Sequence, residues 1–159
     1  MATVLSSKAQ QVQDALKTLG FSHQVVESSQ TTRSAAEAAD AIGCRIEQIA
    51  KSLIFRSKNT DRPILVIASG PNRVDGTKIA EYCAEPVEMA SADFVKKRTG
   101  FVIGGVPPVG HREELETYID EDLFQHDEIW AAAGSPSAVF SLPPEDLTKM
   151  TGGRVVSIK

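Results

Sequence analysis

The sequence predicts an α+β fold in which helices flank a central mixed β-sheet. Helical and extended patterns alternate irregularly along the 159 residues, and several connections between them are short enough for hairpins. The apolar run from Ile64 to Ala68 is the most continuous in the chain, which indicates a central strand with both faces buried. We therefore expect one domain over residues 1–159, long enough to bury roughly 68–70% of the surface that the unfolded chain exposes.

The chain up to Arg98 is expected to hold five helical segments and four strands. Apolar residues recur at helical spacing from Ser7 to Leu19, and the run Phe21–Glu27 is typical of a strand. Ser34 and Glu37 form a capping box at the start of a second helix, which Gly43 ends. The segments expected next are a helical turn at Ile46–Ile49, strands at Ser52–Phe55, Ile64–Ala68 and Pro86–Met89, and helices at Thr77–Cys83 and Ser91–Arg98.

The second half begins with a short apolar strand, Phe101–Ile103, which runs into a loop rich in glycine and proline. Pro144 suits the first turn of a later helix, because the N–H that proline lacks would be unpaired there in any case. The remaining expected elements are strands at Glu116–Ile119, Glu128–Ala133, Val139–Leu142 and Arg154–Ile158 and a helix at Pro144–Met150. The irregular order of these elements favours a mixed sheet over a doubly wound parallel one.

The formal net charge of −4 argues against a protein whose whole surface binds nucleic acid, because such binding rests on clustered Lys and Arg. A local basic patch remains open. The best linear candidate is Lys96–Arg98, which we interpret first as a solvated helix end that complements the helix dipole.

The cysteines, the histidines and the hydropathy pattern point away from several classes of protein. Cys44 and Cys83 lack C-x-x-C spacing, so we expect buried free thiols and neither a zinc site nor a redox motif. The three histidines are scattered, and we expect no metal and no cofactor. The first residues lack the apolar core of a signal peptide, and no apolar run approaches the roughly 20 residues of a membrane helix. We therefore expect a soluble cytoplasmic protein.

The loop within Thr99–His111 is the first candidate for a binding site. Gly104 and Gly105 permit positive φ and close backbone approach to a ligand, while two prolines stiffen the exit. The N–H groups of Gly105 and Val106 are then candidates to face a carbonyl oxygen or a phosphate. The alternative is a rigid turn between two strands, because glycine and proline are common in turns.

Lys51 and His111 are the titratable residues with the strongest claim to a function. Lys51 stands in an apolar stretch where a helical turn leads into a strand, and lysine is rarely buried without a partner or a task. If its side chain points outward, it is a surface residue, and strand parity does not decide between the two. His111 directly follows the glycine-rich loop, although a structural histidine is equally compatible with its position.

Three motifs in their order along the chain resemble the YbaK family, free-standing relatives of the editing domain inserted in bacterial prolyl-tRNA synthetases. They are Ala50-Lys51-Ser52-Leu53, then Thr99-Gly100-Phe101 with Gly104-Gly105-Val106-Pro107-Pro108-Val109-Gly110, then Ala133-Gly134 with Leu142-Pro143-Pro144-Glu145-Asp146-Leu147. The resemblance covers nearly the whole chain. It implies a mixed, partly barrel-like β-sheet surrounded by helices and the hydrolysis of tRNA that carries the wrong amino acid.

The resemblance also implies which residues act. Lys51 matches the family's lysine in the substrate cleft, and Gly104–Pro108 match the loop that receives the aminoacyl ester. We expect Lys51, Gly104 and Gly105 to be catalytic. The residues expected to bind substrate are Asn72, Arg73, Val106, Pro107, Pro108, His111, Gly134 and Ser135.

Two positions depart from the cysteinyl-tRNA deacylases of the family. Pro107 stands where those proteins typically have serine, and the segment Ser137–Phe140 lacks their acidic residue. The segments Asn72–Asp75 and Ala133–Pro136 are closer to relatives that clear other small residues from tRNA for proline. We expect alanine, 2-aminobutyrate, serine or cysteine as the residue removed, from a pocket formed in part by the apolar tract Ala138–Phe140.

The expected reaction needs no nucleophilic side chain, because an aminoacyl ester is already activated and water can attack it. Lys51 would bind the carbonyl oxygen or a terminal phosphate. The expected partners are the acceptor end of a mischarged tRNA and a prolyl-tRNA synthetase. Two alternatives remain: a non-catalytic module that binds tRNA or a synthetase, and an enzyme that binds a free nucleotide on the loop. The second is weakened because the loop does not open a helix.

Overall fold

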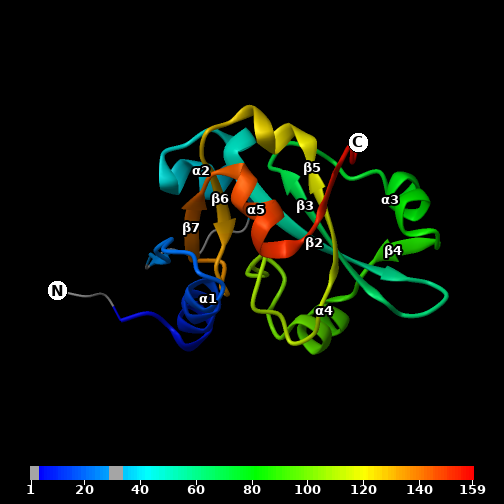
Figure 1. Ribbon diagram of the computed structural model, residues 1–159, viewed down its shortest axis with the longest axis horizontal. Coiled ribbons are helices and arrows are strands. Elements are labelled where there is room, and N and C mark those ends of the chain that lie inside the picture. The colour runs from blue at the N-terminus through cyan, green and yellow to red at the C-terminus, as the bar shows by residue number, and fades with distance from the viewer. Residues whose placement is uncertain (1–3, 29–33) are drawn as a thin grey trace.

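The computed structural model describes residues 4–28 and 34–159, which form one eight-stranded sheet with helices around it (Figure 1). The strand order is β1-β7-β6-β2-β3-β5-β8, and β4 pairs with β2 off this path. The pairs β2 with β6, β3 with β5 and β5 with β8 are parallel, and the other pairs are antiparallel. The predicted mixed sheet flanked by helices is confirmed.

The described elements follow the predicted order closely. The α-helices are α1 (Ser7–Thr18), α2 (Ala35–Ile42), α3 (Gly76–Cys83), α4 (Ala92–Thr99) and α5 (Pro144–Thr151). The strands are β1 (Val26–Glu27), β2 (Ile49–Ser57), β3 (Pro63–Ser69), β4 (Val87–Met89), β5 (Glu116–Asp120), β6 (Ile129–Ala132), β7 (Ala138–Leu142) and β8 (Arg154–Val156). Two short 3₁₀ helices are η1 (Ile46–Gln48) and η2 (Glu121–Gln125).

Local sequence signals fix the start and end of α2 as predicted. The side chain of Ser34 accepts a hydrogen bond from the N–H of Glu37, which satisfies one of the unpaired donors of the first turn. Gly43 ends the helix in the left-handed region, at φ 85°, which glycine adopts without a steric penalty. The polar residues 29–33, which the sequence places before this helix, lie outside the described residues.

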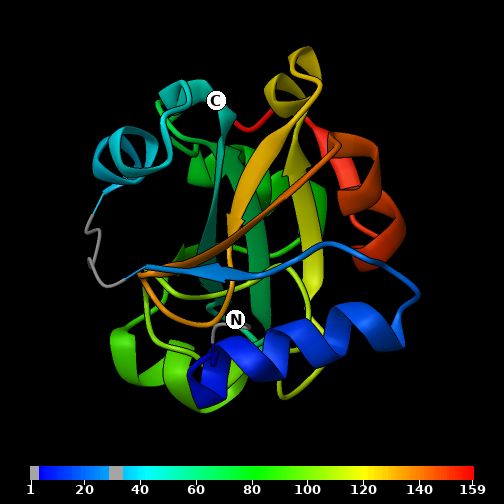
Figure 2. The ribbon, with the colours of Figure 1, turned by 90° about the vertical axis from the view of Figure 1, so that its left-hand side faces the viewer.

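The core lies on both faces of β3, whose seven residues are all buried, as a central strand requires. One face packs against α1 and α5, with Leu16, Leu65 and Leu147 fully buried. The other face packs against α3, with Ile64 and Ile79 fully buried. Figure 2 shows α1 across the lower end of the sheet, and α2 and α5 on opposite sides of it.

Two predicted strands differ in the structure. Phe101–Ile103 forms no strand, because Gly100 ends α4 at φ 86° and the N–H of Gly105 turns back to the carbonyl of Val102. Phe101 is buried, while Val102 and Ile103 are exposed on the turn. Of the predicted strand Phe21–Glu27, only the two residues of β1 pair with β7.

One edge of β2 is covered at its two ends and uncovered in between. Strand β6 pairs with Ile49 and Ala50, and β4 pairs with residues 55–57 on the same edge. The carbonyl of Ile54 accepts the N–H of Ala90. Alternate residues of a strand direct their peptide groups to opposite edges, so Ser52, like Ile54, directs its N–H and C=O to the uncovered part. This gap interrupts the sheet beside Lys51.

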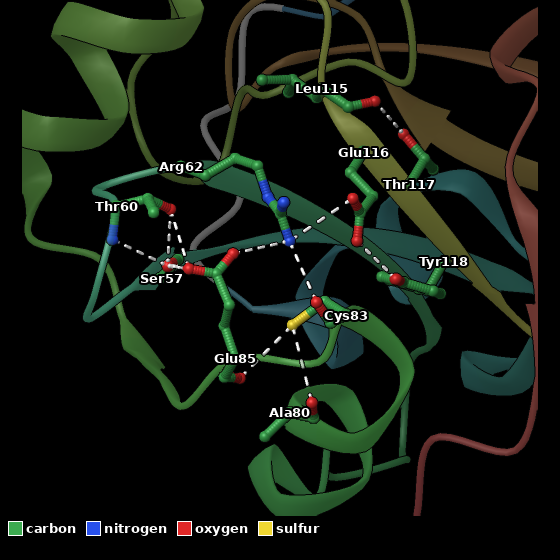
Figure 3. Close-up of polar contacts among 10 residues, drawn as sticks. All are labelled: Ser57, Thr60, Arg62, Ala80, Cys83, Glu85, Leu115, Glu116, Thr117 and Tyr118. Atoms are coloured by element: carbon green, nitrogen blue, oxygen red, sulfur yellow. Dashed lines mark hydrogen bonds and ion pairs between the residues drawn. The ribbon is translucent and has the colours of Figure 1, made fainter.

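A polar cluster holds the far end of β2 to α3 and β5 (Figure 3). The carboxylate of Glu85 accepts the hydroxyls of Ser57 at 2.6 Å and Thr60 at 2.9 Å. The Arg62 guanidinium lies 2.9 Å from Glu85 and 3.5 Å from Glu116. The buried Arg62 Nε has no hydrogen-bond partner among residues 4–28 and 34–159, but the other groups of the cluster satisfy one another. The cluster anchors the β2–β3 hairpin.

The two cysteines are free thiols, as predicted, and Cys83 is buried while Cys44 is partly exposed. Among residues 4–28 and 34–159, no helix has the length and apolar character needed to cross a membrane.

Candidate functional site

A pocket of about 290 Å³ lies at the uncovered edge of β2, between α2, the strands β6 and β7 and the turn at 103–106. Most of its wall is apolar, with small side chains from several elements. The polar side chains that line it are those of Ser34, Lys51 and Ser52. The full lining is Ser34, Ala35, Ala38, Ile49, Ala50, Lys51, Ser52, Leu53, Ile103, Gly104, Val106, Trp130, Ala131, Ala132, Pro136, Ala138 and Val139.

Lys51 is the third residue of β2, not the end of a helical turn, and its side chain is half-buried at the pocket. Its Nζ donates to the carbonyl of Gly70 at 2.9 Å, which leaves two further N–H donors. Burial lowers the pKa of the Lys51 ammonium, Asp120 opposes this shift, and Arg73 adds to it. The pocket thus contains a cation whose charge is incompletely compensated.

Ser52 also lines the pocket, and sequence reasoning missed it. Its hydroxyl oxygen is buried and has no hydrogen-bond partner in the part of the chain that the structure describes. Its peptide N–H and C=O face the gap in the sheet, as the pairing of β2 requires. A serine beside an apolar strand segment gives no signal in sequence, because only the missing edge partner makes its polar groups available.

The turn at 102–106 presents a different donor from the pair that the sequence suggests. The N–H of Gly105 donates to the carbonyl of Val102 at 2.9 Å, so this donor is already used within the turn. The N–H of Val106 has no acceptor among the described residues, and Val106 lines the pocket. Gly104 adopts φ 88° at the pocket wall. Val106 and Gly104 thus stay candidates at the pocket, while Gly105 shapes the turn.

Gly134 and Ser135 support this turn from behind. The N–H of Gly134 donates to the Gly105 carbonyl at 2.9 Å. A Cβ on Gly105 would lie 2.8 Å from the Cα of Ser135, and one on Gly134 would lie 2.6 Å from the carbonyl oxygen of Lys8 in α1. The two predicted binding residues do not line the pocket themselves. Gly134 and Ser135 pack against the turn, and Gly134 also packs against α1.

Pro107, Pro108 and His111 lie behind the turn and outside this pocket. The ring of His111 contacts the Pro107 carbonyl through Nε2 at 2.5 Å and stacks edge-on against Phe101. Burial lowers the pKa of His111, so the neutral ring donates from Nε2 to this carbonyl. Pro108 and His111 border a separate cavity on the other side. The structure thus gives these three residues a role in shaping the loop.

Asn72 and Arg73 lie beyond β3, near Lys51. The Asn72 amide donates to the carboxylates of Asp120 and Asp122, both at 2.8 Å, so it is occupied in holding its own loop. Arg73 is exposed, and no hydrogen bond or ion pair to it is found among the described residues. The two predicted binding residues therefore differ: one is structural and the other is available.

Within the described part of the chain, no group of three or more His, Cys, Asp or Glu side chains is placed to hold a metal ion. The donors that the pocket brings together are an ammonium, a hydroxyl and peptide N–H groups in an apolar wall. Such donors suit an uncharged carbonyl that develops negative charge.

Comparison with known proteins identifies the family and the fold of the chain. The family model of the aminoacyl-tRNA editing domain matches residues 29–150. A crystal structure of a "putative trans-editing enzyme for prolyl tRNA synthetase" superposes with a TM-score of 0.93 at 44% identity, over 98% of this chain and 99% of that chain. These findings confirm the resemblance to the YbaK family and the fold that it implies.

Two curated relatives are similar in sequence. YwhH of Bacillus subtilis (strain 168), an uncharacterized protein, is 32% identical over 133 residues, which are 84% of each chain. The "Putative Cys-tRNA(Pro)/Cys-tRNA(Cys) deacylase EbsC" of Enterococcus faecalis (strain ATCC 700802 / V583) is 28% identical over 126 residues, which are 79% of this chain and 76% of that one.

Proposed function

Because the chain belongs to the family of aminoacyl-tRNA editing domains, we propose that it hydrolyses the ester of a misacylated tRNA. The substrate is tRNA(Pro) carrying a small amino acid: alanine, 2-aminobutyrate, serine or cysteine. The protein meets the acceptor end of this tRNA, alone or beside a prolyl-tRNA synthetase. The similarity to the "putative trans-editing enzyme for prolyl tRNA synthetase" supports the choice of tRNA.

One observation carries the proposal: unpaired polar groups surround a pocket whose wall is otherwise apolar. The Lys51 ammonium has spare donors, and neither the Ser52 hydroxyl nor the Val106 N–H has a partner among the described residues. Buried polar groups in proteins are normally hydrogen-bonded, because an unpaired one costs about 1–3 kcal/mol. Groups left unpaired together at one pocket are suited to partners that the substrate brings.

In this mechanism, water attacks the ester carbonyl carbon and forms a new C–O bond. The carbonyl oxygen becomes an oxyanion, which Lys51 and the Val106 N–H stabilise. The ester C–O bond then breaks, and the terminal ribose oxygen leaves with a proton from the attacking water. A single oxyanion donor contributes about 2.7–4 kcal/mol in a comparable site. The ammonium of the amino acid would donate to Ser52, away from the like charge of Lys51.

The side-chain pocket selects for size. Its wall contains the small residues Ala35, Ala38, Ala50, Ala131, Ala132 and Ala138. Of the tract that the sequence suggested, Ala138 and Val139 line the pocket, while Phe140 is fully buried in the core. An apolar pocket discriminates by only about 1–3 kcal/mol per methylene and rejects a hydroxyl poorly. We expect graded rates on several small residues, with the prolyl ester spared.

The test is a deacylation assay with alanyl, 2-aminobutyryl, seryl, cysteinyl and prolyl esters on the same tRNA(Pro). We expect the alanyl and 2-aminobutyryl esters to react fastest and the prolyl ester slowest. A clear preference for cysteine would contradict the apolar pocket. Rapid hydrolysis of the prolyl ester would contradict editing. Tight binding of the charged tRNA without turnover would instead establish the non-catalytic module.

A further inference from the structure

A second concavity, of about 660 Å³, continues from the pocket along β2. It shares Lys51 and Leu53 with the pocket, and it extends between β4 and the loop that leads into α3. Both cavities meet at the uncovered edge of β2, so one ligand can occupy both. We call this second concavity the β4 groove. Figure 1 shows β4 and α3 together at one end of the sheet, beside β2.

The charges of the β4 groove favour an anion. Its cations are Lys51 and Arg73, and Arg73 is exposed without a hydrogen bond or ion pair among the described residues. Its one carboxylate, Glu88, forms an ion pair with Arg56. Asp120 compensates the charge of Lys51 only in part, and Arg73 has no ion pair among the described residues, on a chain whose formal net charge is −4. An exposed guanidinium suits phosphate, which it binds through parallel hydrogen bonds.

The opposite side of the groove is apolar. Met89 is 58% exposed on β4, and the partly buried side chains of Val74 and Val87 lie with it along the groove. A flexible thioether packs favourably on flat aromatic rings. The groove therefore combines a cation that can bind phosphate, Arg73, with an apolar surface on which an aromatic ring can pack.

We propose that the β4 groove holds the 3′-terminal nucleotide of the tRNA, with its phosphate on Arg73 and its base against Val74, Val87 and Met89. This inference rests on the proposed function, in which the ester lies at Lys51. The ribose that carries the ester would then lie where the two cavities meet, at Lys51 and Leu53. The phosphate and the base lie on either side of it in the β4 groove.

The first experiment measures kcat and KM for alanyl-tRNA(Pro) with wild-type protein, Arg73→Ala and Met89→Ala. We expect Arg73→Ala to raise KM by about tenfold with little change in kcat, since it removes the charge-assisted hydrogen bonds to the phosphate. Met89→Ala should raise KM by about threefold. Lys149→Ala on α5 and Val155→Ala on β8 make matched changes at exposed positions outside both cavities and should leave KM unchanged.

The second experiment titrates adenosine 5′-monophosphate into the whole protein and follows backbone NMR signals. We expect shifts in residues 71–76 and 87–89, weaker binding of adenosine without phosphate, and loss of binding in Arg73→Ala. This readout does not depend on hydrolysis. If no ester is hydrolysed but the nucleotide binds in this way, the proposed function fails and the groove assignment holds. Unchanged KM values in both groove variants, or shifts confined to other regions, would overturn the assignment.

Discussion

The two ends of β2 differ in the hydrogen bonding of their buried serine hydroxyls. At the far end, Ser57 is fully buried and its hydroxyl donates to Glu85 at 2.6 Å while accepting the N–H of Thr60. At the near end, the Ser52 hydroxyl is buried without any partner among the described residues. The two serines are five positions apart on one strand. One belongs to a closed network and the other faces a pocket.

The difference shows that one strand can hold both polar groups that stabilise the fold and polar groups that are available to a ligand. A satisfied polar cluster fixes the hairpin, because removing any member leaves the others unpaired. Unpaired groups at the other end cost the free protein stability and are available to a ligand. The gap in the edge of β2 between β6 and β4 allows this, since no neighbouring strand takes up the donors there. Four predictions test the comparison.

The largest effect is expected at the near end, from Lys51→Met. If Lys51 stabilises the oxyanion, the variant should lose about 10²–10³-fold in kcat. Its stability should not fall. Burial lowers the pKa of Lys51, so the folded state bears the cost of the desolvated charge below that lowered pKa, and this cost is relieved as pH rises toward 10.5. Single-turnover deacylation and urea unfolding at pH 7 measure both. An undiminished rate would remove Lys51 from the site.

The next prediction compares neighbouring glycines in the turn that closes the pocket. A Cβ on Gly105 would meet the Ser135 backbone at 2.8 Å, so Gly105→Ala should lower stability by about 1–3 kcal/mol. Gly104→Ala meets only Pro136 at 3.7 Å, and its cost is the strain of φ 88°, about 1–2 kcal/mol.

Both glycine variants should slow hydrolysis more than they weaken tRNA binding, because each displaces the Val106 N–H. Thermal unfolding, kcat and tRNA affinity are compared for the two proteins. Equal losses of binding and turnover in Gly104→Ala would count against a catalytic role for the turn, and a change in stability alone would leave it a structural element.

The sharpest comparison uses the two serines of β2. Ser57→Ala leaves the Glu85 carboxylate without its closest donor and should cost about 1–3 kcal/mol of unfolding free energy, with kcat unchanged. Ser52→Ala removes an unpaired hydroxyl and should leave stability the same or slightly higher, while raising KM for the aminoacyl ester. Urea unfolding and deacylation kinetics on both variants check this pair. If both substitutions change the unfolding free energy and KM by the same amounts, the two ends of β2 do not differ in energy as argued.

The smallest effect concerns His111 behind the turn. Burial lowers its pKa below the usual 6.5, so between these two values the unfolded chain binds more protons than the folded one. Stability should rise with pH across this window and fall on acidification through it. His111→Gln should flatten that part of the profile. Urea midpoints at several pH values from 4.5 to about 7.5 give the answer. Parallel profiles for wild type and His111→Gln would show that the ring does not titrate in this way.

The sequence by itself determined the order and type of the main elements, because the signals are local. Helix caps such as Ser34 and Gly43 act within one turn, and the five-residue apolar run at Ile64 is typical of a strand with both faces buried. The motif around Lys51 and the glycine loop indicated the family for the same reason: the residues are contiguous. The predicted strand Phe101–Ile103 does not form, because Gly100 and Gly104 turn the chain on either side of it.

Only the tertiary structure decided which residues meet at the pocket. The Gly105 N–H is used within its own turn, and Gly134 and Ser135 hold that turn from outside through contacts between segments about 30 residues apart. Ser52 became a candidate because β6 and β4 cover the edge of β2 on either side and leave a gap between them. Strand pairing assigns a partner to each peptide group, and no single segment of sequence encodes where that pairing is missing.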